Sequence, residues 1–409
     1  MNDAENLSKL LGHLPPAVFR EFMVDEFGLA MPDADAKKPK KEQREQMEAV
    51  LAALGVGERQ RIEEVAERIV LLSDGAGQDV IDGFKDDIFD DAARETFAAI
   101  PNQYERALWL HVNEPVIFEE ALNARQADVF RQSASCYSGF MAPASLSVLD
   151  DAASKAAFHQ TVAQQLGCSD DAVAIQIFKR LRPDTQTGED VDLYQISIHH
   201  KRPPEIIDCV QASELVPQEV IRAVSSHITY EPANGHLEVL SKDTAGREAL
   251  ARIVADTLLQ SPITGEKIPL KQYDYQSLAA PRNFDLSGEP VAFVKVVELG
   301  YAAGNGRSLL VKIWTKDADD IYAAARSLIG PAFDFRDHHL NYAKLSIKLK
   351  KVGKDRARTI TVILRDDNKC NIKTKREKDR ALCDRLLAKW HLVKEIGHVV
   401  EAPVDTVAA

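Results

Sequence analysis

The sequence predicts a multi-domain α+β protein: an all-helical N-terminal region followed by two antiparallel α+β domains built from β-hairpin–helix units. Apolar residues recur with a helical period over roughly the first 165 residues and alternate with a period of two beyond about residue 190. The alternating segments come in pairs, and each pair is followed by a helical pattern. A chain of 409 residues, of which 45% are hydrophobic, is also too long for one ordinary core.

The helical half divides at a charged segment. Residues 1–30 form an N-terminal helical segment, and residues 31–42, with two prolines and dense charge, form a linker. Residues 43–165 form a helical domain of short helices with aromatic stripes, which must pack on one another to be stable. Within it, Gly55 separates two amphipathic helices, and we expect it to end the first in the left-handed conformation that glycine adopts at little cost.

An α+β domain is expected over residues 166–277. Two alternating segments flank Asn234-Gly235, a dipeptide typical of β-hairpin turns, and a helix is predicted at about residues 244–259.

The hairpin–helix pattern then recurs twice. The turns fall at residues 302–307 and 352–356, and the helices at about 317–329 and 375–390. A Pro- and Gly-containing linker at 278–290 precedes a basic α+β domain at 291–400 and a flexible tail at 401–409. The three units fit either two α+β domains with antiparallel sheets backed by helices or an internal duplication.

Charge is unevenly distributed along the chain. The whole chain carries −12, yet residues 341–394 hold 17 Lys/Arg against 6 Asp/Glu, a net +11, while residues 1–340 carry −20. The five cysteines form no CxxC pair, which suits free thiols in a reducing compartment, and no stretch approaches a membrane span or a secretory signal. We therefore expect a soluble cytoplasmic protein with no membrane contact and no cofactor.

The basic C-terminal hairpin and helix are the first candidate site. Lysines alternate with apolar residues along residues 343–350, so one face of that strand should be buried and the other cationic. A cationic ribbon and helix could follow a phosphate backbone; docking on an acidic partner and a plain solvated surface are the alternatives. No run of exposed aromatic residues accompanies the charge, so a base-stacking platform is not indicated. The candidate polyanion-binding residues are Lys344, Lys348, Lys350, Lys351, Lys354, Arg356, Arg358, Lys375, Arg376, Arg380 and Arg385.

Clusters of acids and histidines are the second candidate site. Asp334, Asp337, His338 and His339 are candidate catalytic residues, because imidazole titrates near neutrality and a carboxylate can orient it. The pairs His199-His200 and His338-His339 are candidate metal ligands. Adjacent residues on a strand point to opposite faces, so a metal site would require the two pairs to converge.

No complete nucleotide-binding, hydrolase or kinase motif is present. We therefore expect a non-catalytic binding or scaffold protein, whose basic C-terminal domain engages nucleic acid or another polyanion and whose acidic helical region engages a protein partner. One alternative is an enzyme or enzyme subunit with a dispersed acid/His site, of the metal-dependent hydrolase or nuclease type. Another is an obligate structural subunit of a larger assembly.

Overall fold

A computed structural model describes residues 4–396 apart from 35–36, 89, 132, 184–189, 212–213, 264–267, 269, 303–307, 313–319, 352–357, 367 and 373–374. The chain forms two compact units. Unit 1 contains residues 1–182 and 191–263, and unit 2 contains residues 183–190 and 264–409. Among the described residues, no helix is both long enough and apolar enough to cross a bilayer.

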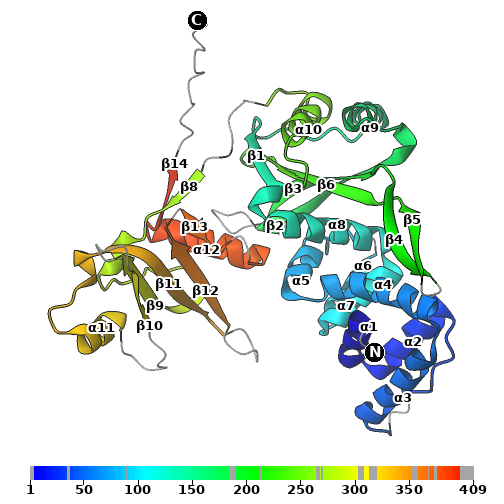
Figure 1. Cartoon of the computed structure of the whole chain (residues 1–409), viewed down its shortest axis with the longest axis horizontal. Helices are drawn as coiled ribbons and strands as arrows, with labels where there is room; N and C mark the ends of the chain where they lie inside the picture. The colour runs from blue at the N-terminus through cyan, green and yellow to red at the C-terminus, as the bar shows by residue number, and fades with distance from the viewer. Residues whose placement is uncertain are drawn as a thin grey trace, which may run out of the picture. The chain divides into compact units, whose positions relative to one another are not determined.

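The N-terminal part of unit 1 is helical, as the sequence predicts (Figure 1). Its apolar stripes meet in one core that includes Leu7, Phe19, Ile69 and Phe118. Gly55 does not end a helix in the left-handed conformation: its φ is −61°, and it precedes the first residue of α4 in extended backbone. The helices are α1 (Glu5–His13), α2 (Pro16–Phe27), α3 (Lys40–Ala53), α4 (Val56–Leu72), α5 (Gly75–Asp82), α6 (Asp91–Ala99), α7 (Gln103–Asn113) and α8 (Pro115–Arg131).

A five-stranded antiparallel sheet completes unit 1, in the order β1-β7-β6-β3-β2. Its strands are β1 (Tyr137–Met141), β2 (Val173–Pro183), β3 (Asp190–Lys201), β6 (Ala223–Glu231) and β7 (His236–Leu240). Helices α9 (Ala152–Leu166) and α10 (Arg247–Val254) cover one face, and α8 lies on the other (Figure 1). Strand β1 falls inside the range expected to be helical; it pairs with β7, which is distant in sequence.

The β6–β7 turn contains the predicted Asn234-Gly235 pair. Gly235 has a φ of +74°, and a Cβ there would lie 2.1 Å from the carbonyl oxygen of Ala142. Glycine is therefore required both by the backbone conformation and by the close approach of another strand end.

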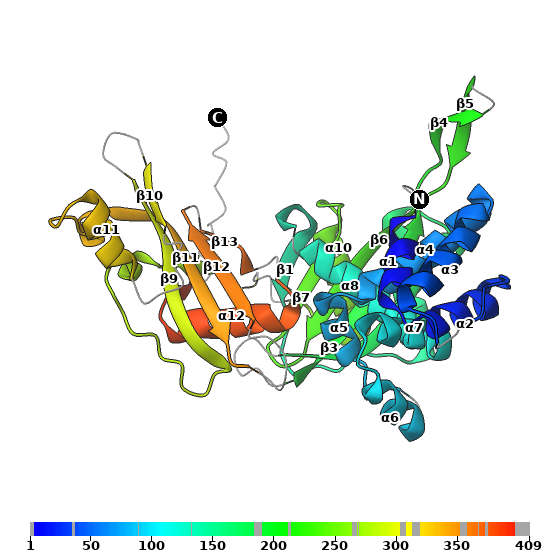
Figure 2. The same cartoon turned by 90° about the horizontal axis from the view of Figure 1, so that it is seen from below.

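A two-stranded ribbon, β4 (Glu205–Gln211) with β5 (Glu214–Val220), extends from unit 1 (Figure 2). Ile206, Val210 and Leu215 on this ribbon are 70–77% exposed. It is built almost entirely from its own cross-strand pairs.

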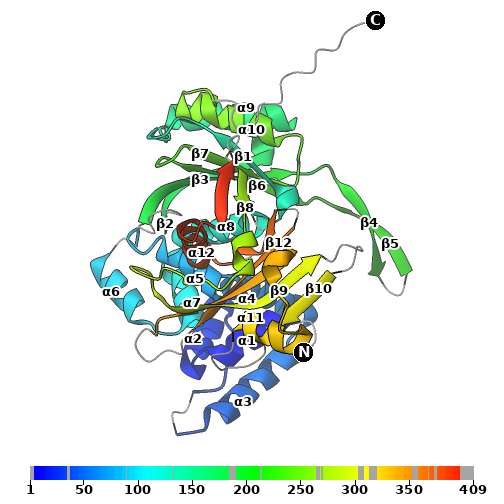
Figure 3. The same cartoon turned by 90° about the vertical axis from the view of Figure 1, so that its left-hand side faces the viewer.

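Unit 2 has a five-stranded antiparallel sheet in the order β10-β9-β11-β12-β13 (Figure 2). Figure 3 shows β10 beside β9. Its strands are β9 (Val291–Ala302), β10 (Ser308–Lys312), β11 (His339–Leu349), β12 (Thr359–Arg365) and β13 (Lys369–Cys370). A separate pair joins β8 (Leu270–Tyr273) to β14 (Val393–Ile396). The helices are α11 (Ile321–Ile329) and α12 (Glu377–Lys389).

The strand pairs and helices of the three predicted hairpin–helix units are confirmed, while the predicted turns at 302–307 and 352–356 lie outside the described residues except for Ala302. They are β6–β7 with α10, β9–β10 with α11, and β11–β12 with α12. The second and third share one sheet, because β9 pairs with β11 along almost its whole length. Apolar residues of α11 and α12 pack on one face of that sheet, against side chains such as Leu345, Ile347 and Val362. The mixed α+β, multi-domain class expected from the sequence is therefore the observed one.

Candidate functional site

Four arginines of the predicted polyanion-binding set are engaged by carboxylates within unit 2. The guanidinium of Arg358 donates to both oxygens of Asp379, at 2.5 and 2.6 Å, and Arg376 Nε donates to the same carboxylate at 3.1 Å. Arg380 lies 3.6 Å from a Glu377 oxygen, and Arg385 lies 3.1 Å from Glu289. The Arg358–Asp379 and Arg385–Glu289 pairs link α12 to other segments of unit 2, whereas the pairs of Arg376 and Arg380 are local to the helix and its N-cap. Much of the positive charge counted in the sequence is therefore neutralised in the fold.

The predicted lysines differ from one another in their surroundings. Lys344 Nζ donates to Glu298 at 3.0 Å, and Lys350 Nζ donates to the carbonyl oxygen of Glu289 at 2.9 Å. Lys348, Lys351 and Lys375 have no carboxylate partner among the described residues. Lys354 and Arg356 lie outside the described residues.

One face of the unit 2 sheet is cationic and carries neither α11 nor α12. Strand β11 buries Ala343, Leu345 and Ile347 on the helix-covered side and turns Lys344, Ser346 and Lys348 to the other, as predicted. Cross-strand pairing extends that second side over neighbouring strands, and we name it the open face. Its residues, row by row, are Phe293–Lys348–Thr359, Lys295–Ser346–Thr361, Glu298–Lys344–Ile363 and Gly300–Tyr342–Arg365.

Two aromatic rings on the open face each lie beside a cation. Lys348 Nζ is 5.3 Å from the ring centroid of Phe293, whose side chain is 46% exposed. The guanidinium carbon of the exposed Arg365 is 5.6 Å from the ring centroid of Tyr342. Both distances are typical of cation–π contacts. The open face therefore combines positive charge with exposed π surface.

Sequence reasoning missed these aromatic residues. Phe293 lies on β9, far from the basic hairpin in the sequence, and is brought beside Lys348 only by the β9–β11 pairing. The alternation of Phe293 and Lys295 with Val294 and Val296 is the signal that could have placed Phe293 on the same face as the lysines.

Two contacts with β9 fix the position of Tyr342. Its hydroxyl donates to Glu298 Oε2 at 2.9 Å, and burial, together with this hydrogen bond, raises the pKa of Tyr342 to about 12. A Cβ at Gly300 would lie 2.9 Å from Tyr342 Cβ, so the tyrosine rests against a position where only glycine fits without displacement. The buried carboxylate of Glu298 also receives Lys344, so one acid fixes two residues of the open face.

A hollow of about 440 Å³ lies at the edge of β9 beside the open face. It is lined by the loop Pro281, Arg282, Asn283 and Phe284, by Val294, Lys295 and Val296, and by Asp320, Ile321 and Tyr322 at the start of α11. Lys295 belongs to both the hollow and the open face, so the two surfaces are continuous.

The predicted acid–histidine cluster of unit 2 is dispersed among different partners. Arg336 donates to both oxygens of Asp334, and this pairing lowers the pKa of Asp334 to about 2. His338 stacks on Tyr301 with the ring centroids 4.3 Å apart, whereas the exposed His339 lies 3.8 Å from Asp366. Asp337 is exposed at the end of a short 3-10 turn. The four candidate catalytic residues thus face different surroundings rather than one shared point.

His199 and His200 belong to unit 1, and the other histidine pair belongs to unit 2. His199 Nδ1 is 2.9 Å from the hydroxyl of Ser225, and its Nε2 is 3.1 Å from Asn123 Oδ1. Burial lowers the pKa of both His199 and His200, which keeps them neutral at neutral pH. Among the described residues, no three His, Cys, Asp or Glu side chains gather as a metal site would require.

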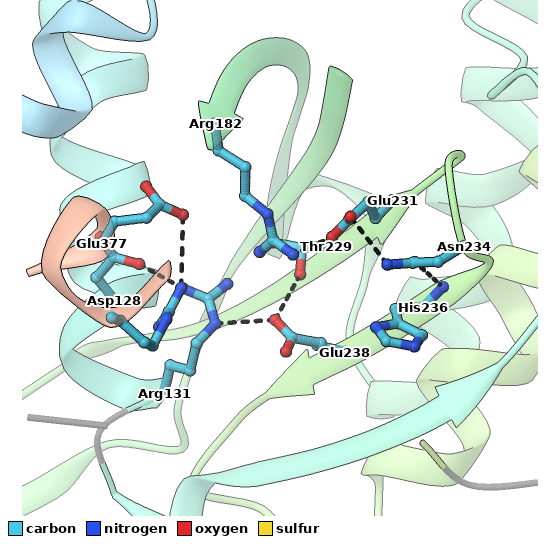
Figure 4. Close-up of polar contacts among 10 residues, drawn as sticks. Asp128, Arg131, Arg182, Thr229, Glu231, Asn234, His236, Glu238 and Glu377 are labelled. Atoms are coloured by element: carbon cyan, nitrogen blue, oxygen red, sulfur yellow. Dashed lines mark hydrogen bonds and ion pairs between the residues drawn. The ribbon is translucent and has the colours of Figure 1, made fainter. Parts of the chain in front are cut away.

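His199 is part of a polar layer between α8 and the unit 1 sheet. Thr229 and Arg131 donate to the same oxygen of Glu238, at 3.1 and 2.8 Å, and Asn234 donates to Glu231 at 2.9 Å (Figure 4). Glu231 also pairs with Arg182. An unpaired buried charged or polar group is costly, so these pairs are accounted for by folding.

A scan against protein-family models found no match to this chain, and a search of curated proteins also found none.

Proposed function

We propose that the protein binds nucleic acid through the open face of unit 2. The observation that carries this proposal is a helix-free sheet face on which Lys348 and Arg365 lie beside aromatic rings. Cations on such a face can neutralise phosphates and release condensed counterions, which drives binding without sequence information. The four arginines paired with Asp379, Glu377 and Glu289 are assigned to folding, so the proposed surface is centred on the sheet rather than on α12.

The acidic charge of residues 1–340 works against binding of a polyanion, so the proposal requires the local field of the contact surface to outweigh it. The proposal that the helical region engages a protein partner is a separate one. Exposed Val56 and Val116, at 85% and 70%, are the first residues to change in testing it.

The test is binding of fluorescently labelled DNA and RNA, single- and double-stranded, measured by anisotropy at two or more salt concentrations. The test variant carries Lys348→Gln, Lys351→Gln and Arg365→Gln, and removes three positive charges at or next to the open face. The matched control carries Arg61→Gln, Lys85→Gln and Lys155→Gln, and removes three exposed positive charges of unit 1.

For a single strand, the logarithm of the binding constant falls with the logarithm of salt concentration by about 0.7 per neutralised phosphate. The test variant should bind more weakly, and its salt slope should be shallower by about 2, while the control should behave as the unmodified protein. Equal losses in the two variants, or no binding by the unmodified protein at low salt, would contradict the proposal.

A further inference from the structure

The two aromatic–cation pairs stand at opposite ends of the open face. Phe293 is paired across strands with Lys348, and Tyr342 lies six residues earlier on β11. At a rise of about 3.3 Å per residue, the two rings are roughly 20 Å apart along the strand direction. They are therefore separate contact points, too far apart for one ligand group to bridge.

Each pair has the composition of a base-stacking site. Every nucleobase has a π face that can lie on an aromatic ring. The cation lies over one face of each ring, so the base would stack on the other face, and the cation adds positive charge for a nearby phosphate. The Phe293 ring is 46% exposed, so a large part of its surface is free to be covered. Tyr342 is oriented in advance by its hydrogen bond to Glu298, which reduces the entropy lost on binding.

Small polar residues occupy the surface between the rings. Ser346 and Thr361 are cross-strand neighbours there, and Lys344 stands beside them with its ammonium group fixed by Glu298. Hydroxyl groups can donate to and accept from base edges or phosphates. The middle of the face is thus polar apart from Ile363, with an aromatic ring at each end.

Given the proposed function, we infer that the ligand of the open face is a single strand of nucleic acid, with one base stacked on Phe293 and another on Tyr342. Bases within a duplex are already stacked and paired, so their faces are not available to these rings. At 3.4 Å per nucleotide, the spacing of a strand in a duplex, a span of about 20 Å is about six steps; a more extended single strand covers it with fewer, so about six or seven nucleotides is the upper limit. The phosphates of the intervening nucleotides pass over Lys344, Ser346 and Thr361.

The test replaces the rings while preserving charge. Phe293→Leu removes the Phe293 ring and keeps apolar volume; Tyr342→Leu does the same at the other end. Tyr342→Phe keeps the ring and loses only the hydroxyl, and Leu328→Ala removes an apolar side chain that is 77% exposed on α11. Binding is measured by anisotropy with single strands of two to twelve nucleotides, DNA and RNA, and with a twelve-base-pair duplex. A thermal melt of each variant confirms that it is folded.

Loss of either ring should weaken binding of a twelve-nucleotide single strand by about 5- to 100-fold, the range for one base–aromatic stack. Duplex affinity should change by less than about twofold, and Leu328→Ala should bind as the unmodified protein does. Tyr342→Phe keeps the ring but loses its orienting hydrogen bond, so it should lose clearly less single-strand affinity than Tyr342→Leu. Affinity should rise steeply up to about six nucleotides and more slowly beyond. Should both ring variants keep full single-strand affinity while the charge-removing triple variant loses it, stacking is overturned and the electrostatic proposal survives. Absence of binding by the unmodified protein overturns both.

Discussion

Arg358 tests whether the arginines paired with carboxylates in unit 2 stabilise the fold and do not bind nucleic acid. Its guanidinium donates two hydrogen bonds to Asp379, at 2.5 and 2.6 Å, and so links the start of β12 to α12. Replacing it, as in Arg358→Gln, breaks both bonds and leaves the Asp379 side chain, which is only 11% exposed, with Arg376 as its remaining ion-pair partner among the described residues.

The expected loss of stability depends on how far the Arg358–Asp379 pair is buried. A hydrogen bond to a charged group contributes about 1.5–3 kcal/mol when buried. The side chain of Arg358 is 41% exposed, so solvent screening reduces that value, and we expect a loss of about 2 kcal/mol for the pair of bonds. Nucleic-acid affinity should fall by less than about threefold, because this cation is already neutralised.

The assay is urea unfolding followed by tryptophan fluorescence, since Trp390 is buried in the core of unit 2. Lys351→Gln is the matched control: it removes an exposed cation near the same hairpin and should leave the free energy of unfolding within about 0.5 kcal/mol. Unchanged stability combined with a large loss of nucleic-acid binding in Arg358→Gln would refute the assignment of this residue to the fold.

Three further predictions concern other positions. Gly300→Ala should destabilise the protein by about 1–3 kcal/mol and weaken single-strand binding, because the new Cβ would lie 2.9 Å from Tyr342 Cβ. Gly57→Ala should instead stabilise the protein by about 0.5–1 kcal/mol, because Gly57 lies in helix α4 with open space around the new Cβ. Urea unfolding measures both changes in the free energy of unfolding. Burial lowers the pKa of His227 from 6.5 to about 3, so between these pH values the unfolded state binds a proton that the folded state does not. The free energy of unfolding should therefore fall as the pH drops from about 6.5 towards 3, by up to about 1.4 kcal/mol per pH unit. His227→Gln should flatten this part of the plot of unfolding free energy against pH, and an unchanged plot would be evidence against this role of His227. Burial, and then the charge of Asp87, raise the pKa of Glu120 from 4.5 to about 7, so stability is lost as the pH rises from about 4.5 to 7 and the loss stays constant above that. Glu120→Gln should therefore raise the unfolding free energy at pH 8 by about 1 kcal/mol, allowing for partial exposure, and should have little effect at pH 4.

The elements of this fold are largely readable in the sequence because each carries a local signal. The alternation along β11 predicts which lysines face outward, and the turn at Asn234-Gly235 marks a hairpin. The three helices that follow the three hairpins begin and end within a few residues of the expected positions. These features depend on side chains close together in the chain, where periodicity and turn chemistry operate.

The candidate site is less predictable because it depends on pairing between distant segments. The charge count along the C-terminal hairpin and helix gives no indication that Arg358, Arg376 and Asp379 neutralise one another, since Arg358 reaches α12 only in the folded sheet. Phe293 becomes part of the cationic surface only through the register of β9 with β11. The register of non-adjacent strands is a tertiary property, and one sequence carries no direct record of it.

The exposure of the apolar residues on the ribbon β4–β5 is also not predictable from the sequence. The sequence did not lead us to expect this strand pair, and nothing local indicates that Ile206, Val210 and Leu215 stay exposed. An isolated two-stranded hairpin is only marginally stable. The exposed apolar surface of this hairpin is evident from the structure and not from the sequence.

The most direct test of the account is photo-crosslinking of the full-length protein to a twelve-nucleotide single strand carrying a photoreactive pyrimidine, followed by mass-spectrometric identification of the crosslinked peptides. If single strands stack on Phe293 and Tyr342, crosslinks are expected at the peptides that contain these two residues. The crosslinks should decrease when unlabelled single strand is added and should be lost in the corresponding leucine variants. Crosslinks confined to unit 1, or to α12 with none on β9 or β11, would contradict it.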